Sequence, residues 1–286
     1  MQRNSPYPYS FVTPAAVVYV VLFLVPTVAS FWFSLTRWDL FDSTFIGLEN
    51  FKQFFKEPFL IQGLVNTIIF GFLTSGAKVV LGLLLAVLLT SGLYAQGFLR
   101  TLIFFPVLVS TIGVGLTFAE LMHPTRGALN VALDLIGMDG PGWLTNPTLA
   151  IFSVAIVDIW KGVGLATLIY IAGLAAISAD YYEAAKIDGA TRYQQFWRVT
   201  VPLVRPATVT VVTLSLISGL RTFDIIWAMT GGGPGFSSDV LASVVYKQYQ
   251  AGFYGLSTAG NVMLFLMIGI LVLPLTYWLN KREIDL

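Results

Sequence analysis

The sequence predicts an all-α polytopic membrane protein with six transmembrane helices. Hydrophobic residues make up 56% of its 286 residues and charged residues only 11%, whereas soluble domains carry about 25% charged residues. The mean hydropathy of +0.79 agrees with this class. Because a soluble domain of this length needs a larger polar surface, the composition excludes a soluble globular enzyme, a disordered chain and a collagen-like chain.

Six apolar runs are each long enough to cross a bilayer. A hydrocarbon core of about 30 Å takes about 20 residues of helix, and the runs lack the period-two alternation of membrane strands. We therefore expect transmembrane helices over roughly residues 11–35, 66–90, 101–121, 149–177, 206–229 and 259–279. Within these helices, Gly82 and Gly164 are expected to permit close packing, and kinks are expected at Pro14, Pro26, Pro106 and Pro274.

Basic residues are denser in the connections on the side that holds both termini. Eight fall on that side and five on the other, and cytoplasmic connections carry the excess of Lys and Arg. The eight are Arg3, Arg100, Lys186, Arg192, Arg198, Arg205, Lys281 and Arg282. We therefore expect a multi-pass protein of the plasma membrane with both termini in the cytoplasm.

Other counts exclude several kinds of site. The chain has no Cys and a single His, so neither a Cys-based nor a His-based metal site is expected, nor thiol chemistry. A net charge of +1 gives no reason to expect a nucleic-acid partner. No phosphate-binding loop of the Gly-x-x-x-x-Gly-Lys type occurs, so the sequence predicts no ATPase activity in this chain.

The connection over residues 178–205 is typical of two short helices separated by a turn. Residues 182–187 favour helix, and Asp188-Gly189 is a signal that ends it. Thr191 can cap the second helix, with Gln194 as its capping-box partner. From these residues alone, a docking surface and a plain amphipathic loop are equally supported.

Six ionisable residues fall inside the apolar runs: Lys78, Glu120, Asp158, Lys161, Arg221 and Asp224. Asp158 with Lys161, and Arg221 with Asp224, are spaced i,i+3 and would share a helix face. Two interpretations stay open: self-neutralised pairs that fix helix packing, or a polar layer that meets a hydroxyl-rich solute. Trp160 and Thr222 lie close by in sequence, and no role follows for Lys78.

The connection over residues 178–205 resembles a motif of a known protein family. Glu183-Ala184-Ala185, with Gly189 six positions after the Glu and Val199 ten further on, resembles the EAA loop of ABC importer permeases. Val199 stands where the family pattern often has Ile. The segment Thr230-Gly-Gly-Gly-Pro234 is similar to the first of the two permease subunits in maltose- and glycerol-3-phosphate-type systems. Further similar positions are residues 45–51, 66–67, Arg100, 105–106, Gly127, Asn130, 143–144, Trp160, Gly164 and 223–224.

The resemblance implies the type I ABC importer permease fold, also called MetI-like, and uptake of a carbohydrate, polyol or glycerol phosphate. Residues 1–60 would hold an N-terminal tail, the first helix and an extracytoplasmic segment. Residues 61–280 would form the permease domain, with the coupling loop at 178–205, and residues 281–286 a cytoplasmic tail. The expected partners are a second homologous permease, two ATPase subunits, an extracytoplasmic substrate-binding protein and the lipid bilayer. ATP and Mg would be bound by the ATPase subunits, and this chain would hold no cofactor.

The resemblance also implies two sets of site residues. ATPase coupling would use Glu183, Ala184, Ala185, Asp188 and Gly189. The substrate pathway would use Asp158, Trp160, Lys161, Gly162, Arg221, Thr222 and Asp224. No catalytic or metal-binding residue is expected.

Two other functional classes stay open beside this one. The first is a secondary transporter coupled to ions through Asp158 and Asp224. It would be supported by inverted repeats, which the sequence does not show. The second is a membrane enzyme, which needs a nucleophile with its base and orienting group, and no such set is evident.

Overall fold

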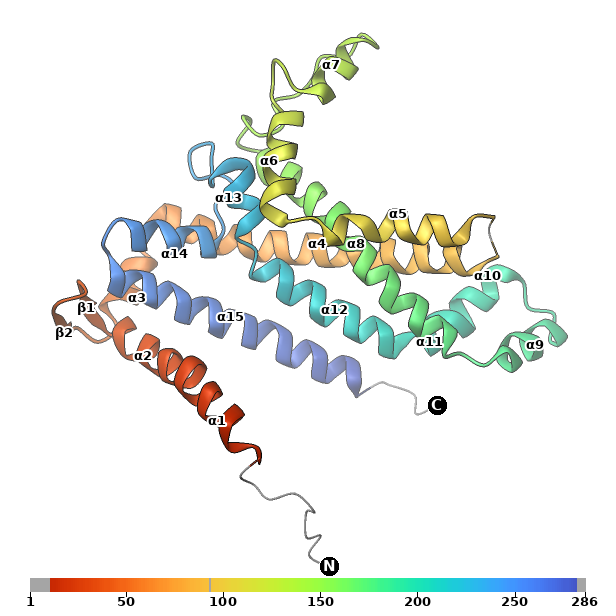
Figure 1. Ribbon diagram of the computed structural model, residues 1–286, viewed down its shortest axis with the longest axis horizontal. Coiled ribbons are helices and arrows are strands. Elements are labelled where there is room, and N and C mark those ends of the chain that lie inside the picture. The colour runs from red at the N-terminus through yellow and green to blue at the C-terminus, as the bar shows by residue number, and fades with distance from the viewer. Residues whose placement is uncertain (1–10, 93, 282–286) are drawn as a thin grey trace, which may run out of the picture. The chain divides into compact units, whose positions relative to one another are not determined.

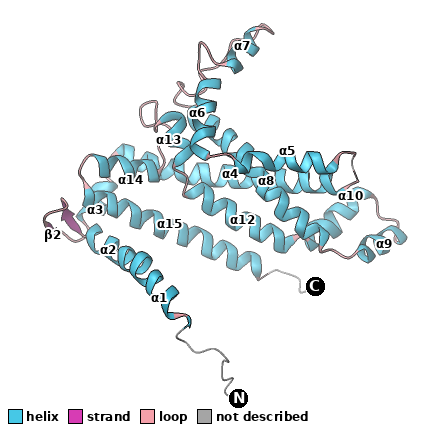
Figure 2. Ribbon diagram, in the orientation of Figure 1, coloured by secondary structure: helices cyan, strands magenta, loops and turns pink. Residues whose placement is uncertain are grey.

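Helices account for most of the described residues, 11–92 and 94–281, of the computed structural model (Figures 1 and 2). The expected all-α class is confirmed. The expectations for Arg3, Arg282 and the tail at 282–286 lie outside the described residues. Among those described, strands form a single small antiparallel hairpin, β1 (Thr36–Trp38) with β2 (Ser43–Phe45), in which Arg37 pairs with Thr44.

Four helical stretches are long and apolar enough to cross a membrane unbroken: Thr13–Ser34, α4 (Pro58–Thr90), α8 (Ala150–Ala175) and α15 (Tyr254–Asn280). The first consists of α1 (Thr13–Tyr19), a π-helical segment (Val20–Leu24) and α2 (Val25–Ser34), with Pro26 in the first turn of α2. Two bent helix pairs also pass by length and composition. Counting each pair as one span gives six, the number that the sequence predicts, although the second pair covers residues 192–220 and the sequence predicts a span over 206–229.

The third expected span is not one continuous helix. The structure places α5 (Gln96–Leu108) and α6 (Thr111–Leu121) at an angle of 97°. Val109 and Ser110 adopt extended backbone angles between them, and the Ser110 hydroxyl accepts a hydrogen bond from the Gly113 amide. The apolar run 101–121 therefore contains two helices, because an N-cap serine starts a new helix inside it.

The fifth expected span, 206–229, is also interrupted. Helix α12 (Arg205–Leu220) ends before Arg221, and α13 (Asp224–Thr230) begins after Phe223, whose φ of −141° and ψ of −60° are not helical. On its other side α12 meets α11 (Val201–Leu203), and the stretch Arg192–Leu203 is bent by 67° from it. Arg221 and Asp224 therefore do not lie on one face of a continuous helix.

The remaining helices lie in the connections. They are α3 (Glu49–Phe54), α7 (Ala128–Asp134), α9 (Ala179–Ile187), α10 (Arg192–Gln195), a π-helical turn (Phe196–Thr200) and α14 (Leu241–Gln250). Helix α7 precedes α8 and α9 follows it, and the two lie at opposite ends of α8 (Figure 1). The connections expected on opposite sides of the membrane are thus separated by the length of α8.

The chain divides into two compact units. The smaller contains residues 1–58 and 244–265, and the larger contains residues 59–243 and 266–286. In the smaller unit the buried Asn50 amide donates to the carbonyl oxygens of Ser34 and Thr36, at 2.9 and 2.8 Å. These bonds satisfy backbone groups where α2 ends and β1 begins. Along Thr13–Ser34 most side chains are exposed, as expected for a helix whose surface faces lipid.

Close helix packing in the larger unit depends on small residues, as the sequence predicts. A Cβ on Gly82 of α4 would lie 2.8 Å from the Cβ of Ala166 on α8, closer than real atoms approach. A Cβ on Gly164 would overlap the carbonyl oxygen of Ile103 on α5. Because lipid offers no hydrophobic drive for helices to associate, this close approach is what holds them together.

We expect Gly164→Ala to lower the thermal midpoint of the purified protein, with a loss of about 1–3 kcal/mol from overpacking against the α5 backbone. Gly76→Ala is the matched control, since Gly76 lies inside α4 and a Cβ there meets no atom within 4 Å. Its midpoint should stay unchanged or rise slightly. Equal midpoints for the two variants would contradict the packing described for α5 and α8.

Candidate functional site

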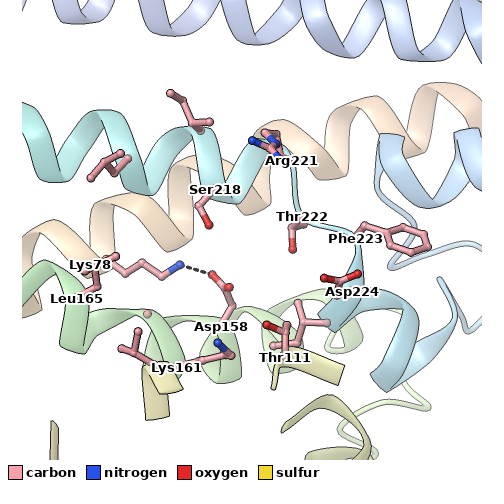
Figure 3. Close-up of a pocket in the computed structure, with 15 residues that line it drawn as sticks. Lys78, Thr111, Asp158, Lys161, Leu165, Ser218, Arg221, Thr222, Phe223 and Asp224 are labelled. Atoms are coloured by element: carbon pink, nitrogen blue, oxygen red, sulfur yellow. Dashed lines mark hydrogen bonds and ion pairs between the residues drawn. The ribbon is translucent and has the colours of Figure 1, made fainter. Parts of the chain in front are cut away.

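A cavity of about 520 Å³ lies in the larger unit, between α8 and the interruption that separates α12 from α13 (Figure 3). Helices α4 and α6 and the C-terminal end of α5 complete its walls. Hydroxyl groups reach it from Thr111, Ser218 and Thr222, and charged groups from both sides. Its volume falls within the range of small-molecule sites, about 300–1,000 Å³.

Six of the seven residues expected in the substrate pathway line this cavity: Asp158, Lys161, Gly162, Arg221, Thr222 and Asp224. Trp160 is the exception among the described residues. Its side chain is 44% exposed and packs against Phe118, with ring centroids 5.2 Å apart. The structure thus brings together residues separated by about 60 positions in sequence.

The interruption after α12 is what delivers polar groups to the cavity. Residues 221–223 leave the helix, so Arg221 and Thr222 are displaced from the face that a continuous helix would give them. Figure 3 shows the side chains of Asp158, Ser218, Thr222 and Asp224 directed toward a common space. Non-helical backbone at membrane depth is stable only where it is buried in protein or lines a watered cavity.

Asp158 pairs with Lys78 of α4, not with Lys161. The Lys78 Nζ lies 2.5 Å from Asp158 Oδ2, and the two side chains are only 6% and 17% exposed. The interpretation of Asp158 and Lys161 as a self-neutralised i,i+3 pair was therefore wrong. Gly162 leaves room for the observed pair, because a Cβ there would lie 2.6 Å from Lys78 Cε and the lysine side chain would have to shift.

Sequence reasoning gave Lys78 no role, although a signal was present. A lysine in the middle of an apolar run of membrane length must find an anion or water. The sequence offers three such anions in other runs, Glu120, Asp158 and Asp224. Only the packing of α4 against α8 selects Asp158.

The second expected pair does not form either. Among the residues that the structure describes, the side chains of Lys161, Arg221 and Asp224 have neither a hydrogen bond nor an ion pair. Glu120, the remaining ionisable group of the apolar runs, forms a bidentate contact with Arg126 at 3.0 and 3.1 Å, in an exposed position. The cavity therefore holds charges that the described part of the chain leaves uncompensated.

The coupling loop has the expected two helices and turn. Ser178 caps α9, and Gly189 ends it with a φ of +73°, while Gly189 and Ala190 donate back to the carbonyls of Lys186 and Ala185 at 3.0 and 2.9 Å. This pattern is a Schellman motif, which favours glycine at the left-handed position. The capping box of Thr191 and Gln194 is confirmed.

The loop exposes most of the residues expected to couple. Glu183, Ala184, Asp188 and Gly189 are exposed, and Ala185 is half-buried. One contact joins α9 to the π-helical turn, where the hydroxyls of Tyr182 and Thr200 lie 3.1 Å apart. A second joins α10 to the preceding turn, where the Gln195 amide donates to the Ala190 carbonyl at 2.9 Å. The pair is therefore a braced unit and not a free loop.

Comparisons with known proteins agree with this architecture. Residues 78–284 match the family model of the binding-protein-dependent transport system inner membrane component. The chain is 32% identical over 268 residues to the trehalose/maltose transport system permease protein MalF of Thermococcus litoralis, covering 93% of this chain and 91% of that protein. It is 31% identical over 279 residues to the sn-glycerol-3-phosphate transport system permease protein UgpA of Pectobacterium atrosepticum, covering 96% and 92%.

A solved structure has the same fold. A chain of a bacterial ABC transporter involved in the import of the acidic polysaccharide alginate superposes with a TM-score of 0.84. The match covers 96% of this chain and 94% of that one, at 23% sequence identity. The expected MetI-like permease fold is confirmed.

We expect Lys78→Met to destabilise the protein by about 3–5 kcal/mol, because it leaves the Asp158 carboxylate uncompensated at low exposure. The double variant Lys78→Met/Asp158→Asn should recover most of the loss, since both charges are then gone. Thermal midpoints of the single and double variants measure this coupling.

Lys161→Met is the matched control for that cycle. It removes a lysine that lies one turn from Asp158 but has no ion pair among the described residues. Its midpoint should change little. If Lys161→Met and Lys78→Met lowered the midpoint equally, the assignment of Lys78 as the partner of Asp158 would be wrong.

Proposed function

This chain belongs to the family of binding-protein-dependent transport system inner membrane components, and on that premise we propose that it is one permease subunit of an ABC importer for carbohydrates. With a second homologous permease it would form the path for an oligosaccharide, a polyol or a glycerol phosphate. The named relatives, which serve trehalose/maltose and sn-glycerol-3-phosphate transport systems, support this class of solute.

The observation that carries the proposal is the polar cavity among apolar helices. Charged groups in a membrane span are costly unless they are paired or line a watered path. Asp158 lies eight residues into α8, about 12 Å from its start at ~1.5 Å per residue. Uncompensated charges at that depth support a route for a polar solute, and the hydroxyls of Thr111, Ser218 and Thr222 suit the hydroxyls of a sugar.

Transport would be driven by partner subunits. In the proposal, two ATPase subunits bind ATP and Mg in the cytoplasm and receive the helix pair α9–α10. Glu183 would pair with a basic group of the ATPase, while Ala184 and Ala185 allow close approach. Because α9 is braced against the helix that leads into α12, a rigid-body movement at the loop would be transmitted to the cavity.

The proposed orientation places both termini and the coupling loop in the cytoplasm of a prokaryotic cell. The connection that holds α7 would then face outward, where a substrate-binding protein delivers the solute. The position of α7 and α9 at opposite ends of α8 supports this arrangement.

An ion-coupled secondary transporter is the less supported alternative. Its two candidate cation ligands were Asp158 and Asp224, and Asp158 is already neutralised by Lys78 at 2.5 Å. Among the described residues no group of three or more His, Cys, Asp or Glu side chains is placed to hold a metal ion. One carboxylate beside two cations is a poor site for a coupling cation.

The test uses the whole transporter in proteoliposomes, with the solute identified by a ligand screen on its binding protein. We expect Glu183→Ala and Gly189→Pro to reduce ATP-dependent uptake at least about tenfold, a loss of ~1.4 kcal/mol in coupling. Proline cannot adopt the φ of +73° found at Gly189, so Gly189→Pro disrupts the turn that ends α9.

Asp42→Ala is the control, since Asp42 is an exposed carboxylate in the turn between β1 and β2 and the proposal gives it no role. Its uptake and ATP turnover should match those of the unaltered protein. Full uptake and coupled ATP turnover in both loop variants would refute the coupling role. Uptake driven by an ion gradient without ATP would refute the importer proposal as a whole.

A further inference from the structure

We infer that the cavity selects carbohydrates that carry one anionic group, a carboxylate or a phosphate, and that Lys78 confers this selectivity by neutralising Asp158. The inference rests on the proposed function and narrows its class of solute. It follows from the charges of five side chains and from which of them are paired.

The charge balance of the cavity is not the one that sequence spacing indicates. Spacing pairs Asp158 with Lys161 and Arg221 with Asp224, which gives a neutral site. The structure adds Lys78 to the same lining. Three cations then face two anions, and the cavity carries an excess of one positive charge.

The pairing decides where that excess resides. Lys78 forms an ion pair with Asp158, with Nζ 2.5 Å from Oδ2, and both side chains are largely buried. Lys161, one turn further along α8, is half-buried, and Arg221 on the opposite wall is exposed. Neither has a side-chain partner among the residues that the structure describes, and Asp224 can offset only one of them.

An anionic solute would complete this site. At membrane depth the surroundings screen charge less than water does, so an uncompensated cation is costly and a partner carboxylate is strongly attracted. Arginine and lysine bind carboxylate or phosphate through charge-assisted hydrogen bonds, which are about twice as strong as neutral ones. A neutral sugar can form hydrogen bonds with the hydroxyls of Thr111, Ser218 and Thr222, but it supplies no negative charge to compensate the extra cation.

The test compares three sugars of nearly equal size: glucose, glucuronate and glucosamine. Binding is measured by saturation-transfer NMR on the assembled permease and ATPase subunits in nanodiscs, without the binding protein, whose own selectivity would otherwise dominate. We expect glucuronate to bind at least about tenfold more tightly than glucose, which corresponds to ~1.4 kcal/mol. Glucosamine should bind most weakly.

Variants assign the preference to particular residues. Lys161→Met and Arg221→Met should each reduce the preference for glucuronate to about threefold or less, and both side chains are open enough for the protein to fold without them. Lys78→Met exposes the Asp158 charge and should abolish the preference. Lys78→Met/Asp158→Asn removes both members of the pair and should restore it.

Thr111→Val is the uncharged control, since it alters a hydroxyl of the same lining. It should change the affinity for all three sugars by the same factor and leave their order intact. Equal binding of the three sugars, tighter binding of glucosamine, or no binding of any would overturn the inference. The importer proposal is judged separately, by ATP-dependent uptake, and survives if that uptake is normal for a neutral sugar.

Discussion

The ammonium of Lys78 and the carboxylate of Asp158 meet 2.5 Å apart inside an apolar bundle, and both the shape and the charge of the cavity depend on that contact. Alone, either group would be a buried charge costing about 3–5 kcal/mol. Together they join α4 to α8 beside Gly162, where a Cβ would lie 2.6 Å from Lys78 Cε and the lysine side chain would have to shift. The same contact removes Asp158 from the uncompensated charges of the cavity. One ion pair therefore both stabilises the packing of α4 against α8 and determines the electrostatic potential of the cavity.

Interrupted helices supply the rest of the site. The breaks at residues 109–110 and 221–223 fall beside the cavity and bring Thr111, Arg221 and Thr222 to its wall. An uninterrupted helix would carry such groups to several faces, including those exposed to lipid. Since backbone polar groups cannot be left unsatisfied in hydrocarbon, the breaks and the polar cavity stabilise one another. This reciprocal requirement explains why charge in this chain is both scarce and concentrated.

The coupling loop is built on a different principle, because its geometry follows from local signals. Ser178 starts α9, Gly189 ends it, and the capping box at Thr191 starts the next helix. None of these devices needs the membrane bundle. The bracing contacts of Tyr182 and Gln195 then tie the loop to the chain that enters α12, which ends at the cavity. The loop and the cavity are thus connected through one short path of helical elements that ends with α12.

The sequence alone predicted four features of this protein. They are the membrane class, the six apolar runs, the caps of the coupling loop, and six of the seven pathway residues that the structure places at the cavity. The membrane class, the runs and the caps rest on composition, length or spacing along the chain, which are local quantities, whereas the pathway residues also rest on the resemblance to a known family. Three features could not be predicted from the sequence. They are the breaks inside two of the runs, the partner of Asp158 and the position of Trp160 away from the cavity. Those features depend on which helix packs against which. A lysine in α4 and an aspartate 80 positions later become partners only when close packing at glycines brings their backbones together, and no pattern along the chain encodes that distance.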